Sequence, residues 1–337
     1  MGNIARVWHK QKPEVLRSYG AVDENDCVRI DTGAVLFRAL AVNALFTLVC
    51  ADGTIDEKRY RKYVNGHVAP SLYVDFFYPL AEESTFEGYL QEIPESSMSP
   101  ELLDVRREIW NALRPYRIRL ITARPSRFIH FGSTRDVHAL MSSGIDAYAY
   151  LNWKRQVDSR VPDASVAAYC SRMDADAHCG ERVYLEYASV RAGSEVGDDS
   201  ILSCIAVSGQ RIPGNVVLHG LKQKNGKYVV RIYGIGDNPK QPYEEGARLF
   251  DMEMQKMPMR PQELWADGAP RNLWSARLYP ECDTMCEALD HALNLYQCAQ
   301  GAGDIEKWRA AHRQSLESSF NQADGSANCA WMQRCRG

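Results

Sequence analysis

Two short turns in this sequence, at residues 31–33 (DTG) and 132–134 (GST), combine glycine with hydroxyl side chains. Glycine lets a ligand approach the backbone closely, so N–H groups at such turns can bind phosphate oxygens or sugar hydroxyls. Lys12, whose backbone is restrained by Pro13, adds a candidate cation. Each of these three places is suited to contact an oxygen-rich, anionic ligand.

Each of these residues is also compatible with a purely structural role. Lys12 taken alone fits a solvated surface lysine, and His130 taken alone fits a histidine whose hydrogen bonds are satisfied within the fold. Asp31 and Asp75 suit the capping of a turn as well as they suit a binding site. The sequence leaves both interpretations open.

Familiar catalytic motifs do not occur in the sequence. It contains no Walker loop, GxSxG elbow, HExxH helix or kinase motif set. The stretch 234–236 (GIG) lacks the third glycine of a dinucleotide-binding fingerprint. A calcium loop at 52–63 is rejected, because Tyr63 stands where the acidic twelfth ligand belongs.

The ten cysteines form no CxxC pair of the kind that binds zinc, and they lack the dense spacing of a disulfide scaffold. Cys282 and Cys286 lie four residues apart, and His178 adjoins Cys179. We interpret both pairs as buried or incidental thiols, with metal ligation as the alternative. No metal ligand is predicted.

The composition is that of a soluble globular protein, with 45% hydrophobic and 25% charged residues. A chain of 337 residues is long enough for about two domains. The formal charge of -3 favours neither nucleic acid nor an acidic membrane as a partner. The longest apolar run, residues 39–50, is too short to span a bilayer, and no secretory signal opens the chain, so a cytoplasmic location is the default expectation.

A period of six residues marks the stretch 180–221. Val190, Val196 and Leu202 recur six apart, with small and turn-forming residues between them. A helix would repeat at three and four, and a half-buried strand at two. One inward aliphatic side chain every six residues is typical of a parallel β-helix, and two ordinary strands joined by a glycine-rich turn are the alternative. We expect the coil to run over about 161–230.

The residues before the coil alternate between strand and helix patterns. We expect a strand at 28–37 broken by the turn at 31–33, a helix at 38–49, a helix after the Ser99-Pro100 cap, and a strand and helix from 118 onward. This order is that of part of an α/β sheet domain, ending near 142–146. After the coil, helices at about 284–296 and 305–320 are expected to close its open end, where strand edges would otherwise be unpaired.

Three separated segments together resemble a sugar nucleotidyltransferase. They are Lys12-Pro13, residues 31–35 (DTGAV) and residues 129–136 (IHFGSTRD). With 72–76 (LYVDF), 230–238 (VRIYGIGDN) and 273–280 (LWSARLYP) in the same order, the chain resembles the fucose-1-phosphate guanylyltransferase and fucokinase family. The likeness spans nearly the whole sequence.

The resemblance implies a fold, a reaction and a site. The fold is a partial Rossmann-like nucleotidyltransferase α/β domain at 1–145, a left-handed parallel β-helix-like domain at 146–240, and a Pro-rich segment with C-terminal helices at 241–337. The reaction is GTP plus fucose 1-phosphate giving GDP-fucose and pyrophosphate with Mg²⁺, whose ligands are not identifiable here. Lys12 is the expected catalytic cation, and the substrate-binding residues are Asp31, Thr32, Gly33, His130, Gly132, Ser133 and Thr134.

The family also implies a Gly-rich phosphate loop before this sequence and, in bifunctional members, a kinase domain after it. Since neither is encoded here, we expect low activity from this chain alone and a missing N-terminal half or kinase domain as partner. Two alternatives remain: a non-catalytic β-helix scaffold or half-enzyme module needing a partner chain, and a hexapeptide-repeat acyltransferase using His178 or His219.

Overall fold

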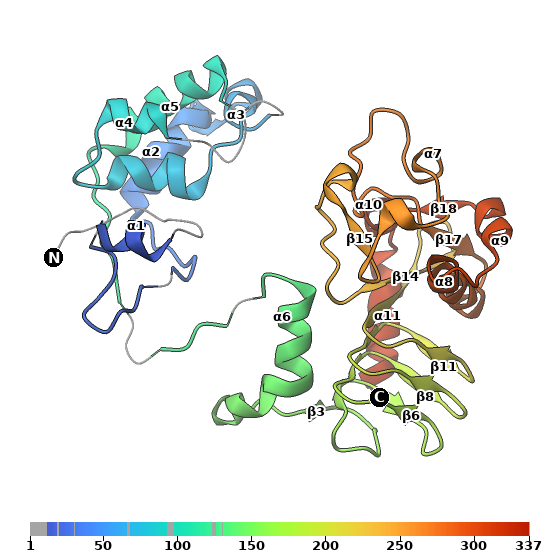
Figure 1. The fold of residues 1–337 in the computed structure, drawn as a ribbon. Coiled ribbons are helices and arrows are strands. Elements are labelled where there is room, and N and C mark those ends of the chain that lie inside the picture. Colours follow the sequence, from blue (N-terminus) through green and yellow to red (C-terminus); the bar gives the residue numbers. More distant parts are fainter. Residues whose placement is uncertain are drawn as a thin grey trace. The chain divides into compact units, whose positions relative to one another are not determined.

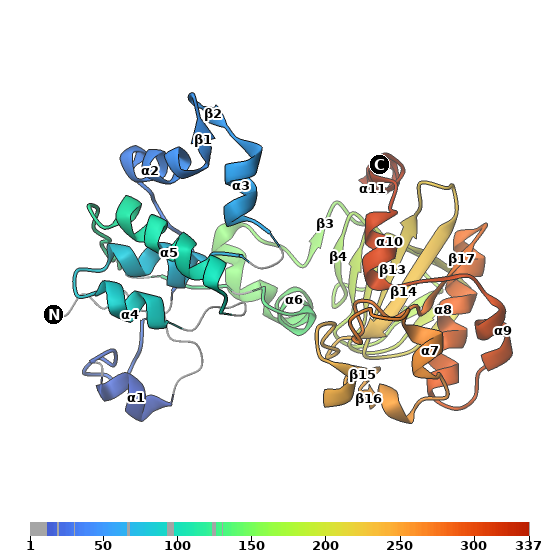
Figure 2. The same ribbon diagram turned by 90° about the horizontal axis from the view of Figure 1, so that it is seen from above.

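The computed structural model describes residues 12–18, 20–29, 31–65, 68–92, 98–122, 126–129 and 131–336. The described residues form two compact units, one within residues 1–129 and one within 130–337. Figures 1 and 2 show the course of the chain through both. Each unit has hydrophobic core residues of its own.

The second unit is built on a three-sided parallel β-solenoid of about three turns between residues 167 and 219 (Figure 1). One side is β3-β4-β7-β10-β13, the second is β5-β8-β11 and the third is β6-β9-β12. The strands are β3 (Gln156–Val157), β4 (Ala167–Tyr169), β5 (Arg172–Met173), β6 (His178–Cys179), β7 (Tyr184–Glu186), β8 (Ser189–Arg191), β9 (Glu195–Val196), β10 (Ile201–Ser203), β11 (Ala206–Ser208), β12 (Arg211–Ile212) and β13 (Val216–Lys222).

The six-residue period corresponds to one buried side chain from each side of the solenoid. Val190, Val196 and Leu202 lie on three consecutive sides and all belong to the main hydrophobic core. Parallel pairing then stacks equivalent residues of successive turns, as in Leu185, Leu202 and Leu218, which are fully buried. The predicted parallel β-helix is therefore confirmed, and its handedness stays a prediction.

Successive turns of the solenoid stack too closely to leave room for a side chain at position 197. A Cβ atom on Gly197 would lie 2.5 Å from the backbone nitrogen of Gly214 in the next turn. Real Cβ atoms do not approach backbone so closely, so the stacking of these turns requires glycine at position 197.

The solenoid's first side continues into an antiparallel sheet. A turn at Asn225-Gly226 joins β13 to β14 (Tyr228–Gly234), with Gly226 at a φ of +85°. This is the hairpin that the Asn-Gly pair predicts. Next to β14 lie β17 (Tyr279–Cys282) and β18 (Arg313–Gln314), which makes a sheet of eight strands.

Helix α8 (Met285–Ala299) supplies the buried residues Ala288, Leu289, Ala292 and Leu295 to the same core as the solenoid. Thr284 caps it by accepting a hydrogen bond from the Glu287 N–H, so α8 begins where the sequence predicts a helix. The single helix expected at 305–320 is wrong, because β18 interrupts it. The structure has α9 (Ile305–Ala310), then β18, then α10 (Leu316–Asn321).

Other elements of the second unit cover the sheet and its ends. Helix α11 (Gly325–Arg336) packs Trp331 against the solenoid corner and donates its indole N–H to the Tyr187 carbonyl at 2.9 Å. The remaining elements are α6 (Thr134–Ala139), η3 (Leu140–Gly144), η4 (Ile145–Leu151), η5 (Tyr243–Glu245), β15 (Arg248–Leu249), β16 (Met252–Glu253), η6 (Met254–Lys256) and α7 (Pro261–Leu264).

The described part of the first unit is mainly helical. Its elements are α1 (Pro13–Ser18), α2 (Ala39–Val49), β1 (Cys50–Ala51), β2 (Thr54–Ile55), α3 (Glu57–Tyr63), η1 (Leu72–Phe77), η2 (Tyr78–Leu80), α4 (Phe86–Gln91) and α5 (Pro100–Leu113). Helices α2 and α5 lie where the sequence predicts them, and Ser99 caps α5. The core centres on α5, whose Leu102, Val105, Ile109 and Leu113 are buried.

The partial Rossmann-like α/β domain expected at 1–145 is not confirmed. The strands in the described part of the first unit are the short antiparallel pair β1 and β2, and the predicted strand at 28–37 contributes one isolated bridge, between Val22 and Val28. Val35 and Phe37 instead pack against the helical core. A strand needs a hydrogen-bonding neighbour, and packing on helices does not supply one.

A buried ion pair gives Asp75 a structural role. Its carboxylate accepts hydrogen bonds from the Arg106 guanidinium at 2.8 Å and from the Ser71 N–H at 2.7 Å. Both charged side chains are almost wholly excluded from solvent. Of the two roles that the sequence left open for Asp75, the structure therefore supports the structural one.

Within the described ranges, no helix combines the length and apolar character needed to cross a bilayer.

Candidate functional site

The first predicted turn lies on the surface of the first unit. Asp31, Thr32 and Gly33 are exposed, and Gly33 has a φ of +69°, which favours glycine. The Tyr73 hydroxyl donates a hydrogen bond to Asp31 at 2.8 Å. The turn is thus tied to η1, which carries the LYVDF segment, while its backbone stays accessible.

Lys12 belongs to the same unit and is exposed. Its carbonyl oxygen accepts the N–H groups of Val15 and Leu16 at 3.0 and 3.2 Å, so the residue directly precedes the first turn of α1. The backbone at Lys12 is therefore held by helix formation, and its side chain is open to solvent.

The second predicted turn belongs to the second unit. Gly132 and Ser133 are exposed and Thr134 is half-buried. Ser133 caps α6, since its hydroxyl oxygen accepts the Asp136 N–H at 3.2 Å. His130, the remaining predicted residue, lies outside the described residues.

Thr134 connects this turn to β14. The Thr134 hydroxyl hydrogen-bonds the phenol of Tyr233, a residue almost 100 positions later in the chain. Burial raises the pKa of the Tyr233 phenol, and the bond from Thr134 partly offsets that rise. The HFGSTRD and VRIYGIGDN segments, which the sequence shows far apart, are therefore in contact.

Helix α6 is fixed to the solenoid by a buried histidine. His138 Nε2 lies 2.8 Å from the carbonyl oxygen of Arg182, so this nitrogen carries the proton and donates it. Farther along, Met141 packs against Tyr184 and Val217 on the outer face of the eight-stranded sheet. These contacts hold the 132–134 turn in place.

The lack of a side chain at Gly236 lets Arg135 approach the backbone. A Cβ atom built on Gly236 would overlap the Arg135 guanidinium and would lie 3.2 Å from an Asp251 oxygen. Asn215 in turn donates a hydrogen bond to the other Asp251 oxygen at 2.6 Å. Arg135 is exposed, so its cation is presented at the surface beside the 132–134 turn.

Asp237 organises the turn after β14 from within. It accepts the N–H groups of Gly234 at 2.6 Å, Phe250 at 2.9 Å and Asp251 at 3.3 Å. Burial raises the pKa of this carboxyl, and the three backbone bonds oppose the rise. Asp237 is therefore a positioning residue for the loop on which Arg135 rests.

A row of polar side chains crosses the outer face of the sheet beside Tyr233. Glu186, Ser203, His219 and Arg231 are direct neighbours on adjacent strands. Ser203 donates to Glu186 at 2.9 Å, and Arg231 hydrogen-bonds His219 Nδ1. Burial and the Arg231 charge lower the pKa of His219 to about 3.

This row bears on the acyltransferase alternative. A histidine that Arg231 already engages, and whose pKa is about 3, is a poor base for proton abstraction near neutrality. His178, the other candidate for that role, is exposed on β6, on the third side of the solenoid. Its neighbour across the strands, Glu195, is paired with Arg211 instead.

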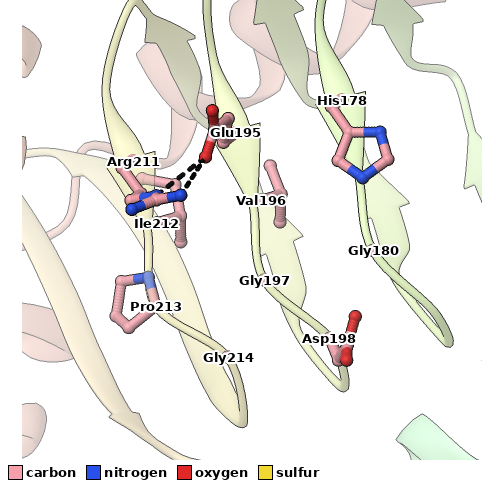
Figure 3. Close-up of a pocket in the computed structure, with 10 residues that line it drawn as sticks. All are labelled: His178, Gly180, Glu195, Val196, Gly197, Asp198, Arg211, Ile212, Pro213 and Gly214. Atoms are coloured by element: carbon pink, nitrogen blue, oxygen red, sulfur yellow. Dashed lines mark hydrogen bonds and ion pairs between the residues drawn. The ribbon is translucent and has the colours of Figure 1, made fainter.

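The groove that contains His178 is a depression of about 330 Å³ on the third side of the solenoid (Figure 3). His178, Glu195 and Arg211 line it along the strands, and Gly180, Gly197 and Gly214 line its edge. Figure 3 shows Arg211 turned toward Glu195. The groove offers a neutralised ion pair, which makes it a weaker site for an anion than the surface around Arg135.

The candidate site in the second unit therefore comprises the 132–134 turn, Arg135 and the Tyr233 side chain, which we call the Arg135 surface. Sequence reasoning selected the turn and missed Arg135 and Tyr233, although both stand in segments that carry the family resemblance. The available signal was the arginine directly after the Gly-Ser-Thr turn, since a phosphate-binding turn is often accompanied by a cation.

Comparison with known proteins gives the family. The model of the fucose pyrophosphorylase domain matches residues 1–284, and the chain belongs to this family. The chain is 22% identical over 248 residues to the fucose-1-phosphate guanylyltransferase of Mus musculus. That alignment covers 66% of this chain and 41% of the mouse protein, so the chain spans well under half of that relative. No solved structure matches the chain.

Proposed function

We propose that the protein binds fucose 1-phosphate and takes part in guanylyl transfer. In this reaction a phosphate oxygen of fucose 1-phosphate forms a bond to the α-phosphorus of GTP. The bond between the α-phosphorus and the bridging oxygen breaks, and pyrophosphate leaves with the electron pair. The observation that carries the proposal is the family match over residues 1–284, which includes both predicted turns and the strand that the second turn contacts.

The roles of this chain's residues follow from charge and access. Lys12 and Arg135 are exposed cations, and each can offset phosphate charge. The backbone N–H groups near Gly33 and Gly132 can meet phosphate or hydroxyl oxygens. The other residues that the family resemblance implies for sugar-phosphate binding are Asp31 and Thr32 in the first unit, and His130, Ser133 and Thr134 in the second.

Magnesium is implied by the reaction, but the described site residues do not form a binding site for it. Mg²⁺ prefers several oxygen ligands in near-octahedral geometry. Among the substrate residues that the structure describes, Asp31 is the one carboxylate, and it accepts a hydrogen bond from Tyr73. We therefore assign no step to a protein-held magnesium ion.

The proposal is tested by calorimetric titration of fucose 1-phosphate into the full chain and four variants. Lys12→Ala and Arg135→Ala should each weaken binding by about 10-fold, the loss expected for one charged hydrogen bond of about 1.5 kcal/mol. Lys256→Ala and Arg211→Ala are matched controls on exposed cations elsewhere in the chain and should bind like the parent.

Binding that Arg211→Ala abolishes and Arg135→Ala leaves intact would move the site to the groove of Figure 3 and contradict the assignment.

A further inference from the structure

Three potential metal ligands meet where β17 joins α8. The Cys282 Sγ, a Glu287 carboxylate oxygen and a ring nitrogen of His291 all lie within 4.8 Å of one another. Cys282 is buried, His291 is half-buried and Glu287 is exposed. The cluster shares no residue with the proposed function, and it lies where β17 leads into α8, both labelled in Figure 1.

Local structure brings the three residues together. Cys282 is the last residue of β17, and Thr284 then caps α8. Glu287 and His291 are four positions apart on α8, so they share one face of the helix, about one turn from each other. The short cap connection sets Cys282 beside that face.

His291 carries the second observation that points to a ligand. Its Nδ1 atom is buried and has no hydrogen-bond partner among the described residues. An unsatisfied buried polar atom costs about 1–3 kcal/mol, so such atoms are rare without a water or ion.

We propose that Cys282, Glu287 and His291 bind a divalent metal ion of the zinc class, with Cys282 Sγ, a Glu287 oxygen and a ring nitrogen of His291 as ligands. Thiolate and imidazole favour Zn²⁺ over Mg²⁺ or Ca²⁺, and a fourth, tetrahedral position is left for water. Binding forms a metal–sulfur bond and releases the thiol proton to solvent. The ion ties the end of β17 to the first two turns of α8.

The geometry requires a small adjustment. Zinc–sulfur and zinc–nitrogen distances of about 2.3 and 2.0 Å place tetrahedral ligands about 3.5 Å apart. The ligand atoms lie within 4.8 Å of one another, so side-chain rotations that shift each atom by about 1 Å bring them to metal-binding distance. The exposed Glu287 side chain can change rotamer, since it accepts one long hydrogen bond, from the Asp283 N–H at 3.3 Å.

Some charges near the cluster favour a bound cation and others oppose it. Lys227 and Lys307 act on the cluster and oppose a cation, while Asp283 and Asp290 favour one. Lys227 Nζ lies 3.6 Å from an Asp283 carboxylate oxygen, so these two charges offset each other beside the cluster.

Cobalt titration of the full chain, kept reduced, tests the site, because a Co²⁺–thiolate bond absorbs in the near ultraviolet. We expect one equivalent of Co²⁺ to bind with this absorption, and Zn²⁺ to displace it. Cys282→Ser should abolish the absorption, and His291→Ala should weaken binding by about 100-fold, at least the loss seen for outer-shell residues. Cys286→Ser, an exposed thiol four residues away, is the matched control and should bind like the parent.

Glu287→Gln keeps the test decisive if a core substitution at Cys282 disturbs the fold. It changes an exposed side chain, so the circular dichroism spectrum should stay unchanged while Co²⁺ affinity falls by about 10-fold. Absence of thiolate absorption at one equivalent overturns the proposal. Loss of the absorption in Cys286→Ser, or full affinity in both His291→Ala and Glu287→Gln, overturns it as well.

Discussion

Polar side chains around the Arg135 surface divide into those that already have protein partners and those that are open to solvent. Ser133, Thr134 and Asp237 already have protein partners, in the α6 cap, Tyr233 and three backbone N–H groups. Arg135 is exposed beside Gly236. A ligand at this surface would therefore meet the Arg135 cation and the turn backbone first, because the hydroxyls are engaged.

The buried histidine of the polar row, His219, should make the free energy of unfolding depend on pH. The pKa of His219 is about 3 when folded and ordinarily about 6.5, so the unfolded chain binds more protons between these values. Stability contributed by neutral His219 is present above about pH 6.5 and is lost as pH falls toward 3, by up to about 1.4 kcal/mol per pH unit. In His219→Gln the unfolding free energy should fall less steeply with acid.

Denaturant titrations at pH 7, 5 and 4 measure this difference. Equal pH dependence in the parent and His219→Gln would show that His219 is not held neutral by burial.

We expect the Asp237 carboxylate to stabilise the fold mainly by accepting hydrogen bonds, and less by its negative charge. Asp237→Ala leaves the Gly234 and Phe250 N–H groups without partners, and should lower the unfolding free energy by about 2–4 kcal/mol. Asp237→Asn keeps one oxygen that can accept from both N–H groups, and it removes a buried charge. It should therefore lower the unfolding free energy by less than half as much as Asp237→Ala. Chemical unfolding of the two variants measures these losses of stability. An equal loss in both would show that Asp237 stabilises the fold through its charge.

At the residue scale, the sequence could indicate the turns but not their partners. Glycine beside Ser133 and Thr134 predicts close backbone approach, and Ser133 is indeed at a helix cap. Tyr233 lies 99 positions after Thr134, and no local pattern encodes which side chain meets it. The same holds for Asp31 and Tyr73, which are 42 positions apart.

Among the elements, the solenoid is the part that the sequence determines most directly. Each side of a turn supplies one inward aliphatic residue, so the pattern repeats locally and needs no distant information. The first unit behaves differently. Val35 and Phe37 have a strand-like pattern but pack against a helical core, because burial alone does not specify hydrogen-bonded neighbours.

The spacing of the solenoid turns makes a direct prediction for Gly197. In Gly197→Ala the added methyl group meets the backbone of the next turn, so the turns must separate, and we expect a loss of roughly 2–4 kcal/mol. Gly325→Ala is the matched control, because nothing lies within 4 Å of its added methyl group at the start of α11. It should be neutral or stabilising by up to about 1 kcal/mol.

Thermal unfolding of both variants measures the contrast. A Gly197→Ala protein as stable as the parent would contradict the close stacking of these turns.

Over the whole molecule, the described residues form separate hydrophobic cores. One core groups residues of α5 with η1 and η2 in the first unit, and the other groups the solenoid with α8 and its neighbours. The family match extends over both units, since it covers residues 1–284.

Separate cores predict that damage to one unit leaves the other folded. Asp75→Ala leaves the buried Arg106 charge unpaired, which costs about 3–5 kcal/mol. Hydrogen exchange followed by mass spectrometry should show faster exchange in 100–113 and unchanged protection in 167–219. Equal acceleration in both regions would show that the units unfold as one.

Ligand binding by the unmodified chain is the most direct test of the proposed function. Calorimetry should show saturable, one-to-one binding of fucose 1-phosphate that neither fucose nor inorganic phosphate reproduces at the same concentration, since the proposed site contacts the sugar and the phosphate together. Binding of inorganic phosphate with the same affinity, or no saturable heat with fucose 1-phosphate, would contradict the account.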